Sequence, residues 1–158
     1  MPEFTIALAP AGDPDAARLI HRHLALMTSQ SPAESCHAQG QSDLEAPGAR
    51  LFLLRQDGVA IAMGALKSLE GGALELKSMH TVSEARGSGA GRAMLTHLVA
   101  LARKEAATGV FLETGSAEEF RPSRQLYATL GFVECPPFST YEEDPLSTFM
   151  YLDLSSAS

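Results

Sequence analysis

A glycine-rich stretch, Glu84 to Arg92, constrains the fold more than any other part of the chain. Its sequence, EARGSGAGR, carries Gly87, Gly89 and Gly91 at alternate positions. A strand-like run precedes it and an amphipathic helical pattern follows it. Glycine lets the backbone approach a ligand closely, and a helix that begins at such a turn directs free N–H groups and its positive dipole end toward that ligand. The stretch therefore predicts an anion site, with phosphate as its usual occupant.

Composition limits what else the chain can be. Its 158 residues, 45% hydrophobic and 20% charged, predict a single domain over 1–158 that ends in a polar tail at 154–158. The net charge of −7 argues against a general nucleic-acid or anionic-membrane partner, so a phosphate site must be local. The start, MPEFTIALAP, lacks a basic signal-peptide region, and no apolar run is long enough to span a membrane. Cys36 and Cys135 fit a reducing cytosol at least as well as a disulfide, so we expect a cytoplasmic location.

Hydrophobic periodicity predicts a mixed α/β domain. Asp13-Pro14 is typical of a helix start, and Asp57-Gly58 and Gly71-Gly72 are typical of tight turns between antiparallel strands. A helical crossover between two strands predicts that they pair in parallel. The expected strands are residues 4–8, 49–55, 59–69, 73–81, 109–114, 132–135 and 148–154. The expected helices follow Asp13 and cover 91–106 and 117–130, with a possible helical turn near 42–46.

The residues around the glycines distinguish between kinds of nucleotide site. A P-loop would carry Lys followed by Ser or Thr after the last glycine, whereas Arg92-Ala93 stands there. A Rossmann fingerprint would follow the first strand of a parallel repeat and would place an acidic residue at the end of the next strand. Here the loop follows an antiparallel meander, although Glu113 does end the next strand. The dinucleotide alternative therefore stays open but fits less well.

Two motifs together resemble the GNAT superfamily of N-acetyltransferases. Residues 86–91, RGSGAG, match the family's R/Q-x-x-G-x-G/A signature, and residues 126–132, LYATLGF, are similar to its L-Y-x-x-x-G-F element. Residues 75–81 resemble the strand before the loop, and the order of elements agrees from Phe4 to Leu154. The resemblance implies the GNAT fold, a mixed and mainly antiparallel sheet of six to seven strands flanked by helices, with a splayed central parallel pair.

The resemblance implies acetyl-CoA as co-substrate and no metal. Backbone N–H groups of the loop would hold the pyrophosphate, with added charge from Arg86 and Arg92. Backbone groups freed by the splayed strand would hold the pantetheine arm, and one N–H would polarise the thioester carbonyl. The expected cofactor-binding residues are Met79, His80, Thr81, Arg86, Gly87, Ser88, Gly89, Ala90, Gly91 and Arg92.

Two catalytic residues are implied by the same resemblance. Tyr127 matches the tyrosine that lies near the sulfur and protonates the leaving thiolate. Glu75 matches a position where some members carry a base, acting directly or through water. The structural alternatives are a core tyrosine for Tyr127 and an outward charge on an edge-like strand for Glu75. The family's asparagine, often seven residues before the tyrosine, is replaced by Phe120, which puts one cofactor contact in question.

The acceptor pocket is expected to involve two further segments, which resemble those of an uncharacterised bacterial subgroup. The substrate-binding candidates in them are Glu34, Ser35, Cys36, His37, Tyr141 and Glu142. A metal at Cys36-His37 would need ligands that the sequence does not space for it, and side chains of adjacent residues in an extended chain point apart, which disfavours a nucleophile pair. The acidic run after Tyr141 either attracts a cationic amine or is a solvated loop. His21, His23, His80 and His97 are expected to be structural or on the surface.

The sequence therefore predicts an acetyl-CoA-dependent N-acetyltransferase that transfers acetyl directly to a primary amine of a small molecule, peptide or protein. The alternatives are a CoA-binding regulatory module without turnover, an acyltransferase using another acyl-CoA or an oxygen acceptor, and a nucleotide-binding domain. Homodimers are common in the family, but no feature of this sequence indicates one.

Overall fold

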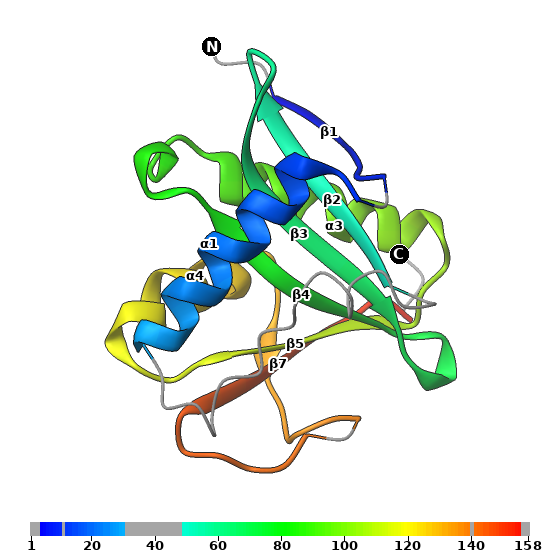
Figure 1. The fold of residues 1–158 in the computed structure, drawn as a ribbon. Helices are drawn as coiled ribbons and strands as arrows, with labels where there is room; N and C mark the ends of the chain where they lie inside the picture. Colours follow the sequence, from blue (N-terminus) through cyan, green and yellow to red (C-terminus); the bar gives the residue numbers. More distant parts are fainter. Residues whose placement is uncertain (1–3, 11, 31–48, 140, 156–158) are drawn as a thin grey trace.

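A computed structural model describes residues 4–10, 12–30, 49–139 and 141–155 (Figure 1). Seven strands form one sheet in the order β1-β2-β3-β4-β5-β7-β6. The possible turn at 42–46 lies outside the described residues. The strands are β1 (Phe4–Leu8), β2 (Ala49–Gln56), β3 (Val59–Ser68), β4 (Leu74–Thr81), β5 (Gly109–Gly115), β6 (Val133–Glu134) and β7 (Ser147–Asp153). The helices are α1 (Pro14–Gln30), α3 (Ala90–Lys104) and α4 (Arg121–Thr129), with short 3-10 turns η2 (Glu70–Gly72), η3 (Ser83–Ala85) and η4 (Glu118–Phe120).

Local sequence explains where the helices begin. At α1, the Asp13 carboxylate accepts a hydrogen bond from the Asp15 N–H at 2.8 Å, and Pro14 occupies the first helical position. At α4, Pro122 lies in the first turn, where its missing N–H costs nothing. Helix α3 begins at Ala90; its N-cap residue, Gly89, has a left-handed φ of 90°, and the N-cap has no side chain to cap the helix.

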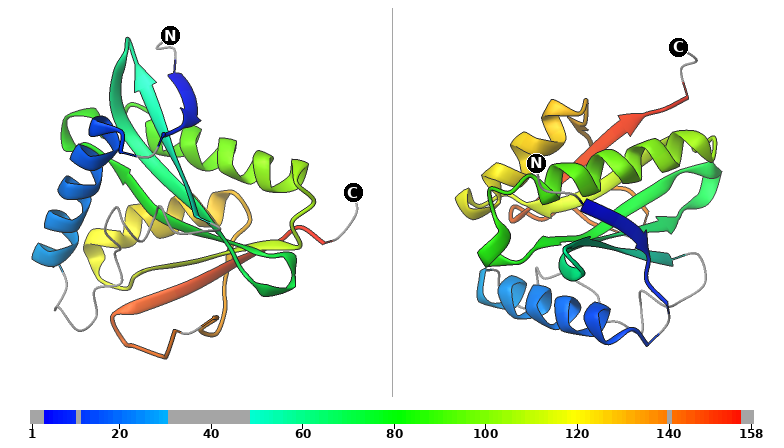
Figure 2. Two further views of the ribbon diagram at one scale, coloured as in Figure 1. Left: turned by 45° about the vertical axis from the view of Figure 1, so that its right-hand side comes forward. Right: turned by 90° about the horizontal axis from the view of Figure 1, so that it is seen from above.

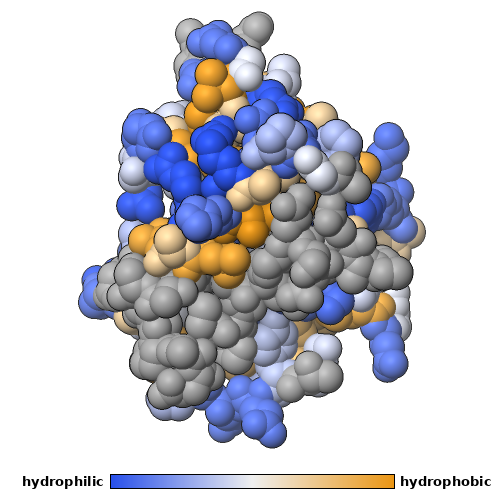
Figure 3. Space-filling view, viewed as in Figure 1, coloured by the Kyte–Doolittle hydropathy of each residue, from blue (hydrophilic) through white to orange (hydrophobic). Residues whose placement is uncertain are grey.

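The helices cover both faces of the sheet. Helix α1 lies on one face, and α3 and α4 lie together on the other (Figures 1 and 2). The apolar stripe of α3, which includes Met94, Leu95 and Leu98, is fully buried against the sheet. Figure 3 shows hydrophilic residues over much of the face that carries α1, with apolar residues gathered in a band across its middle.

Strand pairing confirms the expected mixed and mainly antiparallel sheet. Strands β1 to β4 form an antiparallel meander, and β5, β7 and β6 pair antiparallel in turn. Strands β4 and β5 are parallel, as the crossover through α3 requires. They pair only through Leu74, Glu75 and Leu76, opposite Val110 to Leu112. From Lys77 onward β4 no longer pairs with β5, so the expected splayed central pair is present.

A bulge in β4 sits where the splay begins. The register with β3 shifts between the pairs Ala65↔Lys77 and Met63↔His80, and Ser78 adopts a left-handed φ of 56°. Gly64 lies opposite the bulge, where an added Cβ would come within 2.8 Å of the Met79 sulfur. Met79 therefore points toward α3, whereas Lys77 and His80 occupy the opposite face of the sheet.

Candidate active site

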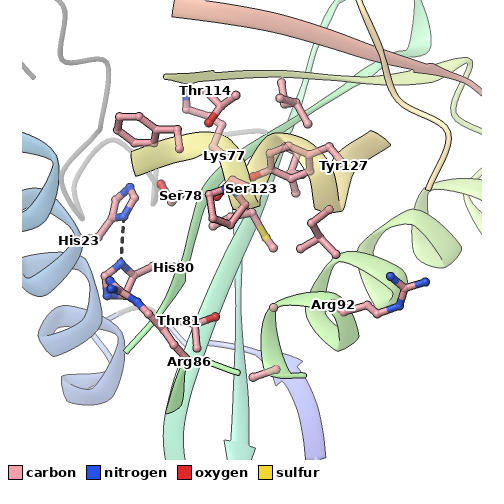
Figure 4. A pocket seen from close by; sticks show the side chains of 18 of the residues that line it. His23, Lys77, Ser78, His80, Thr81, Arg86, Arg92, Thr114, Ser123 and Tyr127 are labelled. Carbon is pink, nitrogen blue, oxygen red and sulfur yellow. Dashed lines mark hydrogen bonds between the residues drawn. The ribbon is translucent and has the colours of Figure 1, made fainter. Parts of the chain in front are cut away.

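A cavity of about 610 Å³ opens where β4 and β5 separate (Figure 4). Its lining comes from α1, β4, the glycine loop, the start of α3, the end of β5, η4, α4 and the loop before β7. The candidate residues that line it are Glu75, Met79, His80, Thr81, Arg86, Gly87, Gly89, Ala90, Gly91, Arg92, Tyr127 and Tyr141. Ser88 and the exposed Glu142 are not part of the lining. The candidates Glu34, Ser35, Cys36 and His37 lie outside the described residues.

The glycine loop forms one end of the cavity. Gly87 and Gly89 have φ values of 82° and 90°, and a Cβ at either would meet no atom within 4 Å, so the backbone is open there. The Ser88 hydroxyl lies 3.4 Å from the Ala90 N–H, at the long limit of a hydrogen bond. The first turn of α3 thus presents backbone N–H groups and the positive end of its dipole to the cavity. Such an end suits a phosphate group.

The two arginines of the loop differ in direction. Arg86 is exposed and lies beside His80, whose pKa it helps to lower (Figure 4). Arg92 points away from the cavity, and its guanidinium donates to the Thr129 hydroxyl of α4 at 3.3 Å. Arg86 is therefore the better placed of the two to add side-chain charge for an anion, while Arg92 offers its backbone.

Tyr127 lies on α4 at the opposite wall of the cavity from His23 and His80 (Figure 4). The residue is only 6% exposed, and its ring packs against Phe132 with centroids 5.9 Å apart. Burial, with a contribution from the nearby Glu113 carboxylate, raises the pKa of the Tyr127 phenol far above its ordinary value. The hydroxyl therefore stays protonated at neutral pH and is available as a donor.

Glu75 does not project outward from an edge strand, so that alternative is wrong. β4 lies between β3 and β5, and Glu75 is only 3% exposed. Its Oε2 atom accepts hydrogen bonds from the Tyr141 hydroxyl at 2.6 Å and from Lys77 Nζ at 3.1 Å. Lys77 Nζ also donates to the Tyr141 oxygen at 2.9 Å. These three side chains, the Glu75–Lys77–Tyr141 triad, form a closed polar cluster in the cavity wall.

Two histidines in the cavity wall were expected to be structural or on the surface. His23 of α1 and His80 of β4 are each 8% exposed, and their Nδ1 atoms lie 3.3 Å apart (Figure 4). Burial lowers the pKa of both to about 4; the charges of Arg86 and Arg22 also lower that of His80, so both rings are neutral at pH 7. One signal for this was present in the sequence: His23 continues the buried stripe formed by Leu19 and Ile20 on α1.

Other lining residues carry no motif that could have revealed them. Phe120 stands where the family often places an asparagine, and it is buried against Gly115. Ser123 of α4 and Thr114 of β5 also face the cavity (Figure 4). Among the described residues, no group of three or more His, Cys, Asp or Glu side chains is arranged to hold a metal ion. Nor is any described helix long and apolar enough to cross a membrane.

Comparison with known proteins shows the family to which this chain belongs. The model of the acetyltransferase (GNAT) family matches residues 18–132. The chain is 39% identical over 132 residues to the uncharacterised N-acetyltransferase YsnE of Bacillus subtilis, covering 84% of this chain and 87% of YsnE. It is 34% identical over 151 residues to the IAA acetyltransferase of Azospirillum brasilense, covering 95% and 97% of the two chains. The structure of yncA from Salmonella typhimurium with its cofactor acetyl-CoA superposes with a TM-score of 0.69 at 22% identity, over 98% of this chain and 96% of that one. The chain therefore belongs to the GNAT family of acetyltransferases.

Proposed function

We propose that this protein transfers an acetyl group from acetyl-CoA to a primary amine, and that Glu75 and Tyr127 carry the two proton-handling roles. The observation that carries this proposal is the position of both side chains in one cavity, which opens at the β4–β5 splay and ends at the glycine loop. When bound, acetyl-CoA supplies the activated acetyl thioester.

The described residues fit that co-substrate. The backbone of the loop and the first turn of α3 would hold the pyrophosphate, with Arg86 beside it. Strand β4 beyond Leu76 has lost its β5 partner, so its backbone can hydrogen-bond an extended arm as a further strand would. The side chain of Met79 points toward α3, so its expected contact would come from the main chain.

Glu75 is positioned to take up the proton of the amine. Two donors, Tyr141 and Lys77, occupy its Oε2 atom, whereas Oε1 has no hydrogen-bond partner among the described residues. An amine entering from this side would lose its proton to Oε1, directly or through one water. As the nitrogen–carbon bond forms, the carbon–sulfur bond breaks.

Tyr127 completes the proton balance on the other wall. Burial keeps its phenol protonated, so its O–H can donate to the negative charge that develops on the sulfur. One proton leaves the amine and one reaches the sulfur. Exchange with solvent returns Glu75 and Tyr127 to their starting states.

Substitution of Tyr127 by phenylalanine tests this assignment. We expect Tyr127→Phe, which removes the phenol hydroxyl, to lower kcat for thiol release about 10- to 100-fold while the Kd for CoA changes little. Tyr151→Phe is the matched control, because Tyr151 lies on β7 outside the cavity lining. Equal loss of kcat and CoA affinity in Tyr127→Phe would contradict the proposed role.

Calorimetry with acetyl-CoA, CoA, ATP and NAD separates the remaining alternatives. Binding of CoA together with thiol release in the presence of an amine supports an enzyme. IAA is assayed beside the panel of amines because a relative carries it in its name. Binding of CoA with no thiol release for any acceptor would favour a regulatory module. Tight binding of ATP or NAD without CoA would overturn the proposal altogether.

A further inference from the structure

Unused hydrogen-bonding groups in the Glu75–Lys77–Tyr141 triad indicate which class of molecule receives the acetyl group. Both charged residues line the cavity, and their side-chain atoms alone are 4% exposed in Glu75 and 8% exposed in Lys77. An ammonium is almost never fully buried in a protein unless it is paired. The hydrogen bonds within the triad use most, but not all, of the donors and acceptors of these two side chains.

One hydrogen-bond donor of Lys77 and one hydrogen-bond acceptor of Glu75 remain unused. An ammonium carries three N–H donors. Lys77 donates one hydrogen bond to Glu75 Oε2 and one to the Tyr141 oxygen. The Glu75 carboxylate has two oxygens that can accept hydrogen bonds, and both donors within the triad reach Oε2 rather than Oε1. Among the described residues, the third N–H of Lys77 and the Oε1 atom of Glu75 have no partner. These two groups are opposite in charge and belong to side chains joined by a 3.1 Å ion pair.

Lys77 stands apart from the other cations of the described cavity lining. The other cations of the described lining are Arg86 and Arg92, which belong to the glycine loop and the start of α3. The two lining histidines are neutral at pH 7. At the Glu75 end of the described lining, Lys77 is the one positive charge.

We propose that the acceptor is a free α-amino acid, whose carboxylate binds Lys77 while its amine faces Glu75 Oε1. A ligand that carries an anionic oxygen and an amine on neighbouring carbons complements both unused groups at once. An amine without a carboxylate would leave the Lys77 donor unpaired in a buried site, which is costly. This inference rests on the proposed acetyl transfer and deepens it by naming the acceptor class.

Matched pairs of acceptors test the proposal directly. Each pair is an α-amino acid and its α-carboxamide, which differ only in the charge at one end, assayed by thiol release from acetyl-CoA. We expect the acid of the preferred pair to have a kcat/KM about 10- to 100-fold higher than its amide. The amine of an amide is less basic and more often neutral, so intrinsic reactivity works against this expected preference. Equal or better use of the amide would overturn the proposal while leaving acetyl transfer intact.

Variants assign the preference to Lys77. Lys77→Met keeps the apolar stem and removes the ammonium, and we expect it to lower kcat/KM for the acid more than for the amide, so that the acid-to-amide ratio falls toward one. Lys67→Met is the matched control, because Lys67 lies on the adjacent strand opposite Glu75 but outside the cavity lining. If the acid-to-amide ratio of kcat/KM persisted in folded Lys77→Met, Lys77 would not bind the carboxylate of the acceptor.

Equilibrium binding tests the preference for a carboxylate without turnover and without a variant. Calorimetry on the wild-type protein loaded with CoA should show tighter binding of the acid than of the amide in the preferred pair. Such binding without any thiol release would support the acceptor class and refute catalysis. Absence of any difference between acids and amides in both assays would overturn the inference.

Discussion

Two buried polar clusters lie on the same face of β4, and they differ in charge: one is an ion pair and the other is neutral. The Glu75–Lys77–Tyr141 triad keeps two opposite charges and joins them through three contacts of 2.6 to 3.1 Å. The His23–His80 pair keeps no charge, because burial lowers the pKa of both rings to about 4. A charged cluster can exchange a proton or bind an ion at neutral pH, whereas a neutral pair mainly fills and orders its site. We therefore expect the triad to govern activity and the histidine pair to govern stability against acid.

The largest effect is expected from removing the charge of Glu75. Glu75→Gln keeps the shape of the side chain but leaves no base for the amine proton, so kcat should fall about 10²- to 10⁴-fold. Steady-state thiol release at saturating acetyl-CoA measures this loss, and thermal melting checks that the variant is folded. The isosteric change Glu134→Gln, in the exposed strand β6, is the control. A kcat within a few-fold of wild type would exclude Glu75 as the base.

Breaking the buried ion pair should cost stability as well. Lys77→Met leaves the Glu75 carboxylate buried without its cation, and we expect the free energy of unfolding to fall by about 3–5 kcal/mol. Urea denaturation measures the change. The double variant Glu75→Gln/Lys77→Met removes both charges and should recover a large part of it, which a double-mutant cycle quantifies. Additive losses would mean that the two side chains do not interact in solution.

The histidine pair should make the fold sensitive to acid. Both folded pKa values, about 4, lie below the ordinary value of 6.5, so the unfolded chain binds more protons between these limits. Above pH 6.5 the two rings do not reduce the free energy of unfolding. As the pH falls toward 4, that free energy decreases by up to about 3 kcal/mol for each ring. Urea midpoints measured from pH 7.5 to 4 should fall more steeply for wild type than for His23→Gln. Subtracting one curve from the other removes the contribution of titrating carboxylates, which both proteins share. Parallel curves would contradict the role of the histidine pair in acid sensitivity.

The smallest effect concerns the bulge that separates the two clusters. Ser78 adopts a φ of 56°, which costs a residue with a side chain about 1 kcal/mol and costs glycine little. Ser78→Gly should therefore change stability only slightly and upward, by about 0.5 kcal/mol after the entropy of the unfolded chain is counted. Thermal melting measures this change. Ser68→Gly, at the end of β3, is the comparison and should be destabilising.

Sequence patterns anticipated the frame of the molecule because they are local. The start of α1 at Asp13-Pro14, the hairpin at Asp57-Gly58 and the buried stripe of α3 each follow from residues within a few positions of one another. The glycine loop is also visible in the sequence, because only glycine adopts the left-handed φ at Gly87 and Gly89 without cost. These features fix the fold class and the end of the cavity that suits a phosphate.

Contacts between distant segments could not be predicted in this way. Glu75 and Tyr141 are 66 positions apart, and His23 and His80 are 57 positions apart. On its own strand Glu75 has the pattern of an outward charge, and only the placement of β4 between β3 and β5 buries it. The low pKa of the two histidines has the same origin, since burial is a property of the packed molecule.

The chain alone thus determined the order of elements, the parallel crossover and the glycine-rich start of α3, because propensity, turn chemistry and hydrophobic period act over a few residues. The tertiary structure decided which polar groups share the cavity. Splaying of β4 from β5 opens the space, and the loop before β7 brings Tyr141 onto Glu75 and Lys77. The physical reason is that burial, and with it the strength of a charge and the freedom of a proton, depends on packing between segments far apart in sequence.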